Sequence, residues 1–374
     1  LKEDKMRIRC EKEQLLSALQ IVQKATATKT TLPILTGIYL SADSGRLELQ
    51  ATDYEMGISI VIPVDVIEPG KAVLSGKIFP DIIRKIPGKL IEISSSSNHS
   101  MINITAEKAE FKVLSFPAEE FPTIKKFESN NQMIIKDDVL KEMVRKTVFA
   151  CSTDESRPLF TGALLEVSDQ ELAMVATNTH RLAVKKISLA AASVALKMII
   201  PGKLLSEVAK VLNSEHPLDV CVYWLKNQVA FSFENIYIMS RIIEGQFPDY
   251  KKVIPHDFLA ECSIDAEILF EAVERVSLLA KDGEYSIIKI KFNQAIMELS
   301  GNNPDAGSAT ENLDAEFVGE PLEIAFNAKY LMDFLRVAGT NMIKFHLKSS
   351  LSPVMVEMND DKTYTYILTP IRTN

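Results

Sequence analysis

Cysteine is scarce in this sequence, and no spacing pairs the four that occur at positions 10, 151, 221 and 262. Scattered cysteines fit a reducing compartment, so we expect a cytoplasmic protein. No run of about 18 apolar residues is present, which excludes a helical membrane span. Residues 1–5 are polar, unlike a secretory signal, and we expect the natural start at Met6 or upstream of it.

The usual signatures of catalysis are also missing. The sequence contains no P-loop, no GxGxxG and no GxSxG motif. No histidine has a second His or Cys at metal-ligand spacing. The adjacent acids at 119–120, 137–138 and 360–361 fall where turns or helix starts are expected, and carboxylates are favourable there without any catalytic role. We therefore predict a protein that is not an enzyme and has no metal or cofactor. The five isolated histidines are His99, His180, His216, His256 and His346.

The composition is that of an ordinary globular protein, with 47% hydrophobic and 25% charged residues. A length of 374 residues suits two or three domains. The net charge of −8 argues against a protein that covers nucleic acid with its whole surface. It is compatible with a basic strip inside an acidic body.

One eight-residue pattern occurs three times, at a constant spacing of 126 residues. Each copy has a Lys, two apolar residues, a spacer, an acid, two apolar residues and a final Lys or Arg. On a helix the apolar positions share one side, while the two basic positions lie on the opposite side. The acid comes four residues after the first Lys and is placed to pair with it. The copies are residues 77–84, 203–210 and 329–336, and their period selects three domains.

The sequence around each copy predicts the same kind of domain. An amphipathic helix opens each repeat, near residues 12–22, 139–148 and 268–276, and strand-like runs follow it, the first of them at residues 34–41. We therefore predict an α+β fold of three repeated domains, each with two helices on antiparallel sheet. Related Phe-Pro segments end the first two repeats, which gives domains 1–128, 129–257 and 258–374. Residues 302–312, rich in Gly, Asn, Asp and Ser, are expected to form a mobile loop.

Residues 176–182 (Ala-Thr-Asn-Thr-His-Arg-Leu) are a local cluster of specific character. They are expected to make a tight turn between two strands of the second domain. Two interpretations stay open on composition alone. The cluster is either a polar hairpin, with His180 and Arg181 holding backbone carbonyls, or part of a binding site.

The repeat and this turn together resemble the bacterial DNA polymerase III beta subunit, the sliding clamp family. Four segments carry the resemblance in the order of the family, and with the repeat they span the chain from Met6 to its end. They are residues 31–35 (TLPIL), 176–183 (ATNTHRLA), 244–250 (EGQFPDY) and 369–372 (TPIR). The family usually has Gly or Ser at the position of Thr179 and an apolar residue at that of Thr369, so details of the cleft are expected to differ.

The resemblance implies a head-to-tail homodimer that closes as a ring of six domains around double-stranded DNA. Helix geometry supports this stoichiometry, because about twelve lining helices spaced roughly 8–10 Å apart leave a hole of roughly 20–28 Å. A closed ring holds its DNA topologically, so weak contacts suffice. The side chains expected to face the DNA are Lys29, Lys77, Arg84, Arg145, Arg157, Lys203, Lys210, Lys329 and Arg336.

The resemblance also implies a hydrophobic cleft that binds a linear motif of partner proteins. Its expected residues are Phe160, Thr177, Thr179, His180, Arg181, Leu182, Pro248, Lys252, Val253, Pro353, Ile367, Thr369, Pro370, Ile371 and Arg372. Among them, His180, Arg181 and Arg372 are expected to supply hydrogen-bond donors at the rim. The expected dimer interface contains Phe111, Val113, Leu278 and Leu279. Expected partners are the polymerase III alpha subunit, the clamp loader and other proteins that carry the motif, in the cytoplasm at the nucleoid and not at a membrane.

Two alternative functions compete with a processivity clamp. The first is a cytoplasmic enzyme with a site in a domain cleft. The sequence shows no convergent set of titratable residues, which argues against it. The second is a scaffold that never meets DNA, and the basic stripe in all three repeats speaks against it. Charge opposite an apolar stripe is commonly just a solvated helix face, but its threefold recurrence favours a functional surface.

Overall fold

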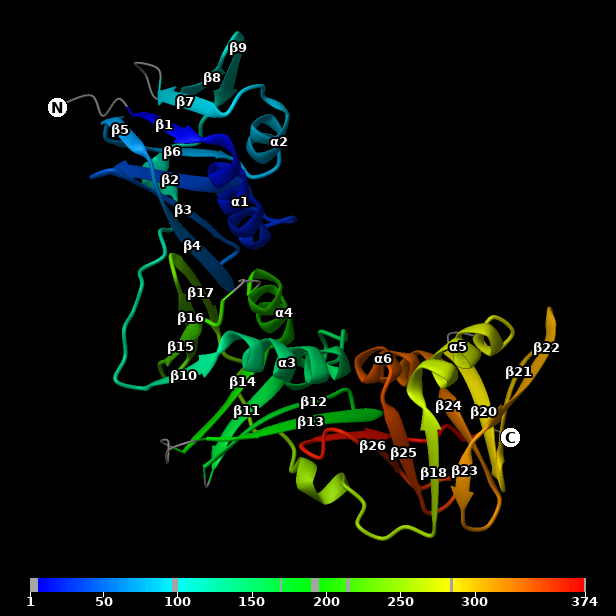
Figure 1. The fold of residues 1–374 in the computed structure, drawn as a ribbon. Coiled ribbons are helices and arrows are strands. Elements are labelled where there is room, and N and C mark those ends of the chain that lie inside the picture. The colour runs from blue at the N-terminus through cyan, green and yellow to red at the C-terminus, as the bar shows by residue number, and fades with distance from the viewer. Residues whose placement is uncertain are drawn as a thin grey trace. The chain divides into compact units, whose positions relative to one another are not determined.

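The structure is a computed structural model that describes residues 6–95, 100–168, 170–189, 195–212, 216–282 and 285–372 (Figure 1). Residues 1–5, which precede the expected start at Met6, and His99 lie outside this part of the chain. The chain divides into two compact units. The first holds Leu1–Asp138 and Lys210–Ile242, and the second holds Val139–Ala209 and Ile243–Asn374. Among the described residues, no helix has the length and apolar character needed to cross a membrane.

The recurring pattern forms a helix in each of its copies, which confirms that prediction. These helices are α2 (Ile78–Lys85), α4 (Gly202–Val211) and α6 (Ala328–Ala338). The helices that open the repeats are α1 (Lys12–Val22), α3 (Asp137–Thr147) and α5 (Ala266–Ser277). In the first unit α1 packs against α2, and in the second α5 packs against α6. The apolar side of α6 is buried through Leu331, Phe334 and Leu335, as its amphipathic pattern requires.

Two antiparallel sheets build the first unit. The smaller sheet has the order β5 (Asp65–Glu68), β1 (Arg7–Glu11), β7 (Leu90–Ser95), β8 (Met101–Ala106), β9 (Ala109–Leu114). The larger has the order β10 (Gln132–Lys136), β15 (Asp219–Trp224), β16 (Gln228–Phe233), β17 (Ile236–Arg241), β4 (Met56–Pro63), β3 (Arg46–Thr52), β2 (Gly37–Asp43), β6 (Gly70–Ser75). Strand β17 of the second repeat pairs with β4 of the first, so this sheet continues from one repeat into the next.

The second unit repeats this plan. Its larger sheet has the order β14 (Leu196–Pro201), β11 (Gly162–Ser168), β12 (Glu171–Thr177), β13 (Arg181–Ser188), β27 (Tyr364–Leu368), β26 (Val354–Met358), β25 (Met342–Leu347), β18 (Ala260–Asp265), β23 (Glu316–Val318). Its smaller sheet runs β19 (Lys281–Asp282), β20 (Tyr285–Asn293), β21 (Ile296–Asn303), β22 (Gly307–Asp314), with β24 (Leu322–Asn327) on β20. Here β13 of the second repeat pairs with β27 of the third.

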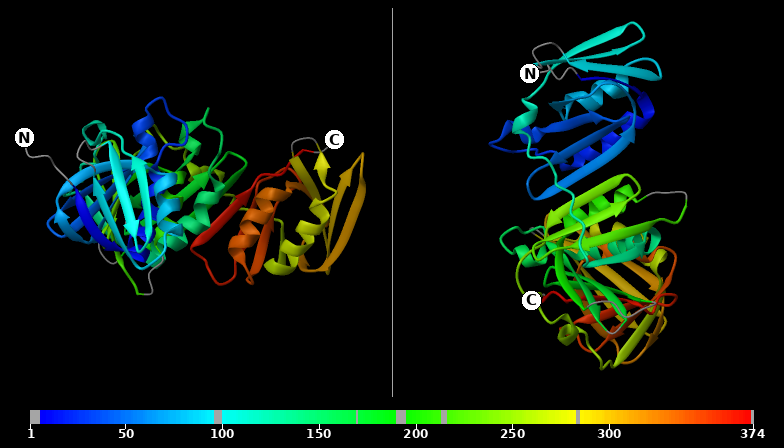
Figure 2. Two further views of the ribbon diagram at one scale, coloured as in Figure 1. Left: turned by 90° about the horizontal axis from the view of Figure 1, so that it is seen from above. Right: turned by 90° about the vertical axis from the view of Figure 1, so that its left-hand side faces the viewer.

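Strand β9 is the last strand of the smaller sheet in the first unit. Two further views show β7, β8 and β9, in cyan, as a ribbon at one end of that unit (Figure 2). Phe111 and Val113 are half-buried, while Lys112 and Leu114 between and after them are exposed. Strand β22 is likewise the last strand of its sheet in the second unit.

The prediction of a mobile loop at 302–312 is wrong. Strands β21 and β22 pair there from Ile296↔Asp314 to Asn303↔Gly307, so the segment is a hairpin. Only the tip of this hairpin needs turn-forming residues, and there Gly307 has φ +125°. Cross-strand hydrogen bonds order the polar residues on either side. The first predicted strand, expected from residue 34, begins only at Gly37, because Pro33–Thr36 forms a 3-10 turn.

Candidate functional site

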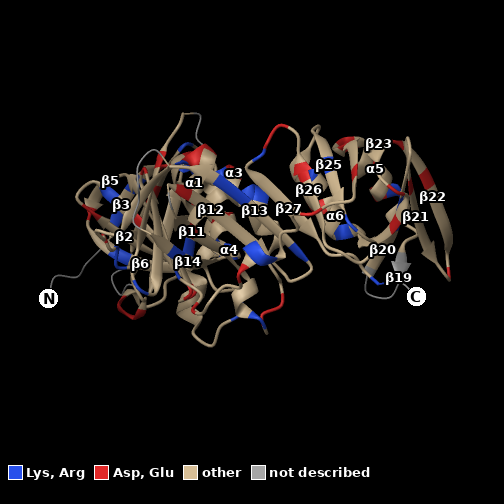
Figure 3. Ribbon diagram, turned by 90° about the horizontal axis from the view of Figure 1, so that it is seen from below, with Lys and Arg blue, Asp and Glu red and all other residues tan. Residues whose placement is uncertain are grey.

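The six basic residues of the recurring pattern are all exposed. They are Lys77, Arg84, Lys203, Lys210, Lys329 and Arg336. Blue Lys and Arg segments mark α4 and α6 in Figure 3. Each helix therefore presents a basic side opposite its buried apolar side.

The acid of the pattern pairs with a different basic residue than expected. Arg84 Nη1 lies 2.7 Å from Asp81 Oδ1, and Arg336 Nη1 lies 3.3 Å from Asp333 Oδ1. In these two copies the acid thus binds the basic residue three positions later, not the Lys four positions earlier. In α2 that Lys, Lys77, stands before the first helical turn as the N-cap residue. The observed order also places Asp81 near the N-terminus and Arg84 near the C-terminus of α2, as the helix dipole favours.

The remaining expected DNA contacts lie in three different places. Lys29 is exposed in the loop after the 3-10 turn Gln23–Ala25, and Arg145 is exposed on α3. Arg157 precedes the 3-10 turn Pro158–Phe160, with its guanidinium 5.7 Å from the centre of the Phe160 ring. Its Nη1 donates to Thr179 Oγ1 at 3.5 Å. The structure therefore groups Arg157 with the turn at 177–182.

This turn is held by its own side chains. Thr177 Oγ1 donates to the Arg181 carbonyl at 2.6 Å and accepts from the Thr179 amide at 3.0 Å. Asn178 Oδ1 accepts from the His180 and Arg181 amides at 3.0 and 3.1 Å. Thr179 has φ +77°, a left-handed conformation that a β-branched residue rarely adopts. The many hydrogen bonds of the turn hold it in this conformation.

The expectation that Arg181 donates hydrogen bonds at the rim of the cleft is wrong. Its side chain is only 6% exposed, and Nη1 pairs with Asp333 Oδ2 of α6 at 2.7 Å. Its Nη2 donates to the Phe149 carbonyl, as the polar-hairpin interpretation proposed for this residue. The guanidinium also lies 4.5 Å from the centre of the Tyr330 ring. A buried cation is stable only with such partners. The charge of Arg181 is therefore compensated by groups of the same chain.

Beside the turn lies a cavity of about 230 Å³ with mainly apolar walls. Ten of the fifteen expected cleft residues line it: Phe160, Thr177, Thr179, Arg181, Leu182, Pro248, Val253, Pro353, Ile367 and Thr369. Leu182 and Ile367 face each other across the β13–β27 ladder, which fixes them as neighbours. Val253 is 53% exposed, so an apolar wall of this cavity is open to solvent. An extended chain with an apolar side chain fits such a surface.

A second cavity of about 280 Å³ shares Thr369 with the first. It contains three more expected residues, His180, Pro370 and Ile371. The expected single cleft is thus two cavities that meet at Thr369. Neither lining set includes Lys252 or Arg372. Lys252 points its ammonium to Asp249 at 3.3 Å, and both Lys252 and Arg372 are exposed.

Six lining residues were not predicted. Phe247, Asp249 and Tyr250 line the first cavity and belong to the EGQFPDY segment, which signalled them. Ile287, Asn327 and Tyr330 line the second and come from the third repeat. Tyr330 is an apolar position of the recurring pattern, but nothing in the sequence connected any of the three with the cleft. Burial raises the pKa of the Tyr250 phenol, and its hydrogen bond to Glu166 Oε2 at 3.0 Å raises it further. Tyr250 therefore stays a neutral donor that fixes the cavity wall.

An ion cluster in the same unit links the second and third repeats. Asp361 Oδ2 accepts from Lys146 Nζ at 2.5 Å and from Lys185 Nζ at 2.6 Å, and both lysines are buried. Glu142 Oε1 approaches the same two ammonium groups at 2.7 and 3.2 Å. Burial alone raises the pKa of Asp361, but hydrogen bonds from the lysines and Thr363 outweigh it and hold this pKa far below its usual range. Asp361 was expected only as a turn acid.

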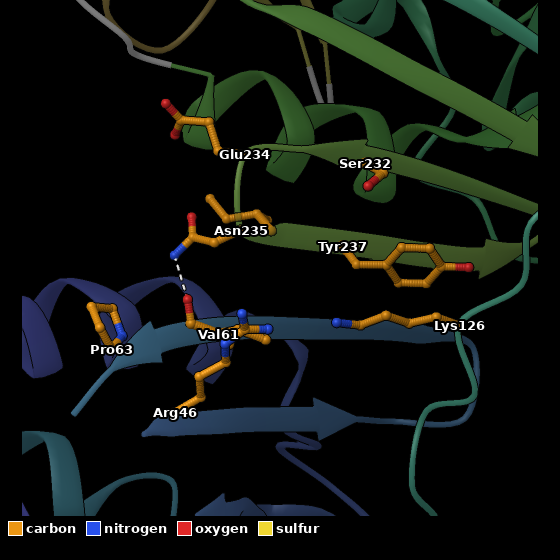
Figure 4. Close-up of a pocket in the computed structure, with 9 residues that line it drawn as sticks. Arg46, Val61, Pro63, Lys126, Ser232, Glu234, Asn235 and Tyr237 are labelled. Atoms are coloured by element: carbon orange, nitrogen blue, oxygen red, sulfur yellow. Dashed lines mark hydrogen bonds between the residues drawn. The ribbon is translucent and has the colours of Figure 1, made fainter. Parts of the chain in front are cut away.

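The first unit has a cavity of about 420 Å³ with mixed polar and apolar walls along the β4–β17 joint (Figure 4). Arg46, Lys126, Glu234 and Tyr237 line it, and Asn235 Nδ2 donates to the Val61 carbonyl at 2.7 Å. Across the described ranges, no group of three or more His, Cys, Asp or Glu side chains is arranged to hold a metal ion.

Comparison with known proteins assigns the family. Three models of the DNA polymerase III beta subunit match in order: the N-terminal domain at residues 6–125, the central domain at 134–249 and the C-terminal domain at 251–372. The beta sliding clamp of Staphylococcus epidermidis is 34% identical over 98% of this chain and all of its own. The clamp of Staphylococcus aureus is 33% identical over the same shares.

Solved structures agree with this assignment. The DNA polymerase sliding clamp of Bacillus subtilis superposes with a TM-score of 0.93 at 32% identity, over 99% of this chain and all of that one. A sliding clamp of Pseudomonas aeruginosa bound to griselimycin gives 0.91 at 28% identity, over 98% and 100%. Three domains of helices on antiparallel sheet are the fold of a clamp. The chain belongs to the DNA polymerase III beta subunit family. Its function is that of a DNA sliding clamp in replication, a non-catalytic processivity factor.

Proposed function

We propose that two copies of this chain close head to tail into a ring of six domains around double-stranded DNA. Sheet continuity supports this, because the repeats already join edge to edge at β4–β17 and at β13–β27. Strands β9 and β22 each end a sheet, and an open edge is a liability that pairing removes. Pairing β9 of one copy with β22 of another makes a third joint of the same kind. Leu278, which is 77% exposed, then packs with Leu279 near Phe111 and Val113.

The proposed DNA contacts are the exposed basic residues of α2, α4 and α6, together with Lys29, Arg145 and Arg157. Contacts to phosphate carry no base information and suit a protein that slides. Asp81 and Asp333 each neutralise one arginine of the stripe. Binding to linear DNA is therefore weak, and the closed ring supplies the retention.

The proposed partner site is the cavity pair at Thr369, and one observation carries it: an open, apolar cavity lies against the rigid turn at 177–182. Partners dock there through a short extended segment with Gln and Leu or Phe anchors. Burying roughly 300 Å² of apolar surface is worth about 7–8 kcal/mol. Hydrogen bonds add to this and ordering of the peptide subtracts from it, so single motifs bind in the micromolar range.

The clients proposed are the polymerase III alpha subunit, the clamp loader and other DNA-processing proteins with the motif. Micromolar binding suits partners that exchange, and two chains allow two clients at once. The domain boundaries proposed are 1–128, 129–257 and 258–374. The proposed location is the cytoplasm, at the nucleoid.

A peptide titration tests the partner site. A labelled peptide of the Gln-Leu-x-Leu-Phe type is titrated against the wild type, Leu182→Asp and a deletion of residues 370–374. Both changes should abolish saturable binding, because they place a charge in the apolar wall or remove the shared edge of the cavities. Leu259→Asp is the matched control, since Leu259 is 75% exposed and lines neither cavity. Equal affinity of all four proteins places the partner site elsewhere.

A further inference from the structure

The turn beside the partner cavity has a counterpart in the first unit. We name residues 52–57 the first turn and residues 177–182 the second turn. Tyr54 and Thr179 occupy the same place in them, with φ +72° and +77°. Each amide donates to a threonine hydroxyl two residues earlier, Thr52 or Thr177, at 3.0 Å in both turns.

The agreement extends to the other hydrogen bonds. Asp53 Oδ1 accepts from the amides two and three residues later at 3.1 and 2.8 Å, and Asn178 Oδ1 does the same at 3.0 and 3.1 Å. In both joints, a backbone amide of the following repeat also donates a hydrogen bond to a carbonyl of the turn. The Arg241 amide donates to the Glu55 carbonyl at 3.2 Å, and the Thr369 amide donates to the His180 carbonyl at 3.0 Å. The two repeat joints therefore carry the same local structure, not merely the same sheet order.

The two turns differ at the wall residue. In the second turn Thr177 pairs with Leu182, which lines the open cavity. In the first turn Thr52 pairs with Gly57, which has no side chain to form a wall. The space over Gly57 is not empty: a Cβ atom at this position would lie 2.9 Å from Ile124 Cδ1 and 3.1 Å from Ile124 Cγ1.

Ile124 comes from the segment that joins the first repeat to the second, and residues 121–127 are named the linker here. The Ile124 amide donates to Gln50 Oε1 at 2.7 Å, so the linker backbone binds the sheet through a side-chain amide. Upstream, the Phe121 ring stacks on Tyr39 with 5.2 Å between centres. The linker thus presents an aliphatic side chain to the turn from a backbone that is hydrogen-bonded to the sheet, as a bound peptide does.

Charge complements this packing. Lys126 of the linker pairs with Glu48 at 3.3 Å, and it also lines the 420 Å³ cavity of the first unit (Figure 4). The first turn carries Asp53 and Glu55 where the second turn carries Asn178 and His180. The first turn is therefore more acidic than the second turn, and the linker beside it contains two lysines.

We propose that the first joint is a second peptide cleft, which the linker of the same chain occupies with Ile124 as its anchor. This inference rests on the proposed partner function of the second turn. It accounts for one open cleft per chain although the turn occurs twice. A peptide suited to this cleft has an aliphatic anchor followed by lysines, which is the chemistry of the linker itself.

The test removes the anchor and offers the linker sequence in trans. The probe is a labelled peptide that copies residues 121–127 (Phe-Pro-Thr-Ile-Lys-Lys-Phe), followed by fluorescence anisotropy. Leu182→Asp is present in every protein of this series, so that the second cleft does not contribute. Ile124→Gly in that background should bind the probe saturably below millimolar concentration. The protein with Leu182→Asp alone should not bind the probe, because its linker still fills the first cleft. Lys125→Gly in that background should not bind it either. This variant loosens the linker as much as Ile124→Gly does, but the exposed Lys125 is not the anchor.

The outcomes separate the two proposals. Saturable binding by the Ile124→Gly protein that disappears when the probe carries Asp in place of its Ile supports the occupied cleft. A folded Ile124→Gly protein that binds no more probe than the Lys125→Gly protein overturns it. If circular dichroism shows that Ile124→Gly does not fold, Ile124→Ala takes its place under the same criteria. The Gln-Leu-x-Leu-Phe-type peptide is measured in parallel on Ile124→Gly with Leu182 intact, and failure there rejects the partner site at the second turn instead.

Discussion

Asp333 joins the two candidate sites, because its carboxylate pairs with Arg181 at 2.7 Å and with Arg336 at 3.3 Å. Arg181 belongs to the turn beside the partner cavity, and Arg336 belongs to the basic side of α6. The same helix contributes Tyr330 to the second cavity. The proposed partner site and the proposed DNA surface are therefore built on one rigid element.

Asp333→Asn should destabilise the protein strongly. It leaves Arg181 buried without its charge partner, and breaking a buried pair in this way costs roughly 3–5 kcal/mol. The measurement is the midpoint of thermal or urea unfolding. Asp81→Asn is the matched control, because it breaks an exposed pair at the same position of the pattern. Exposed pairs contribute at most about 1 kcal/mol, so equal shifts for both variants would contradict the buried role of Asp333.

Acid should weaken the protein through Asp361. Its pKa in the folded state lies below the value of about 3.9 that an unfolded chain has, so its ion pairs stabilise the fold fully above that value. This contribution disappears as the pH falls from about 4 towards the lower pKa of the folded state. Unfolding midpoints measured at neutral pH and in steps down through the acidic range should fall steeply at the acidic end for the wild type.

Asp361→Asn should lower the midpoint at neutral pH and flatten its fall below a pH of about 4. The reason is that Lys146 and Lys185 then lack this carboxylate at all pH values. Asp360→Asn changes the exposed neighbouring acid and should follow the wild-type curve. A wild-type slope that persists in Asp361→Asn would assign the acid sensitivity to other groups.

The three helices of the proposed DNA surface were predictable because their pattern is local. Each copy holds its apolar and basic residues within eight positions, and recurrence separates it from chance. The strands β1, β10 and β18, which precede the opening helices, were missed although Arg7–Glu11 alternates between exposed and buried residues. Alternation over about four to eight residues is the usual signal of a half-buried strand, so β1 at least could have been found from the sequence.

The long-range features could not be predicted. Asp361 meets Lys146 and Lys185 only because β27 pairs with β13, and nothing at residues 360–361 points to partners that lie 176 residues or more away in the sequence. The burial of Arg181 has the same origin, since its partner Asp333 is 152 residues distant. The rim role assigned to Arg181 followed from the family resemblance, which places this residue at the cleft without showing that its side chain is buried. The pairing of the second and third repeats turns its side chain inward.

Encirclement predicts that DNA topology controls release. A clamp loaded onto nicked circular DNA should stay bound in salt that releases it from short linear duplex, and cutting the circle should free it. The physical reason is that a ring slides off an end without breaking any bond within the protein. Retention is measured by gel filtration of labelled clamp before and after cleavage. Identical dissociation from linear and circular DNA would reject encirclement.

The basic helices should set the salt dependence of that binding. Lys203→Ala with Lys210→Ala should weaken binding to linear duplex and lower the slope of log affinity against log salt by about 0.9 for each phosphate that is no longer neutralised. Lys226→Ala with Lys291→Ala is the control, because it removes the same charge from exposed residues outside the pattern. Equal slopes for the two double variants would place the DNA elsewhere.

The last prediction is that the ring closes through β9 and the region after α5. Leu278 is 77% exposed and Leu114 on β9 is 76% exposed, an arrangement that a partner subunit explains. Burying a leucine contributes about 1.5–3 kcal/mol, whereas a lysine at its place brings an unpaired charge into the joint.

Sedimentation should therefore give the wild type twice the chain mass of 41.7 kDa at micromolar concentration and should give Leu279→Lys the single mass. Leu259 is 75% exposed just before β18 of the same repeat, and Leu259→Lys should remain a dimer. A wild-type monomer, or a dimer untouched by Leu279→Lys, would move the closing joint away from this edge.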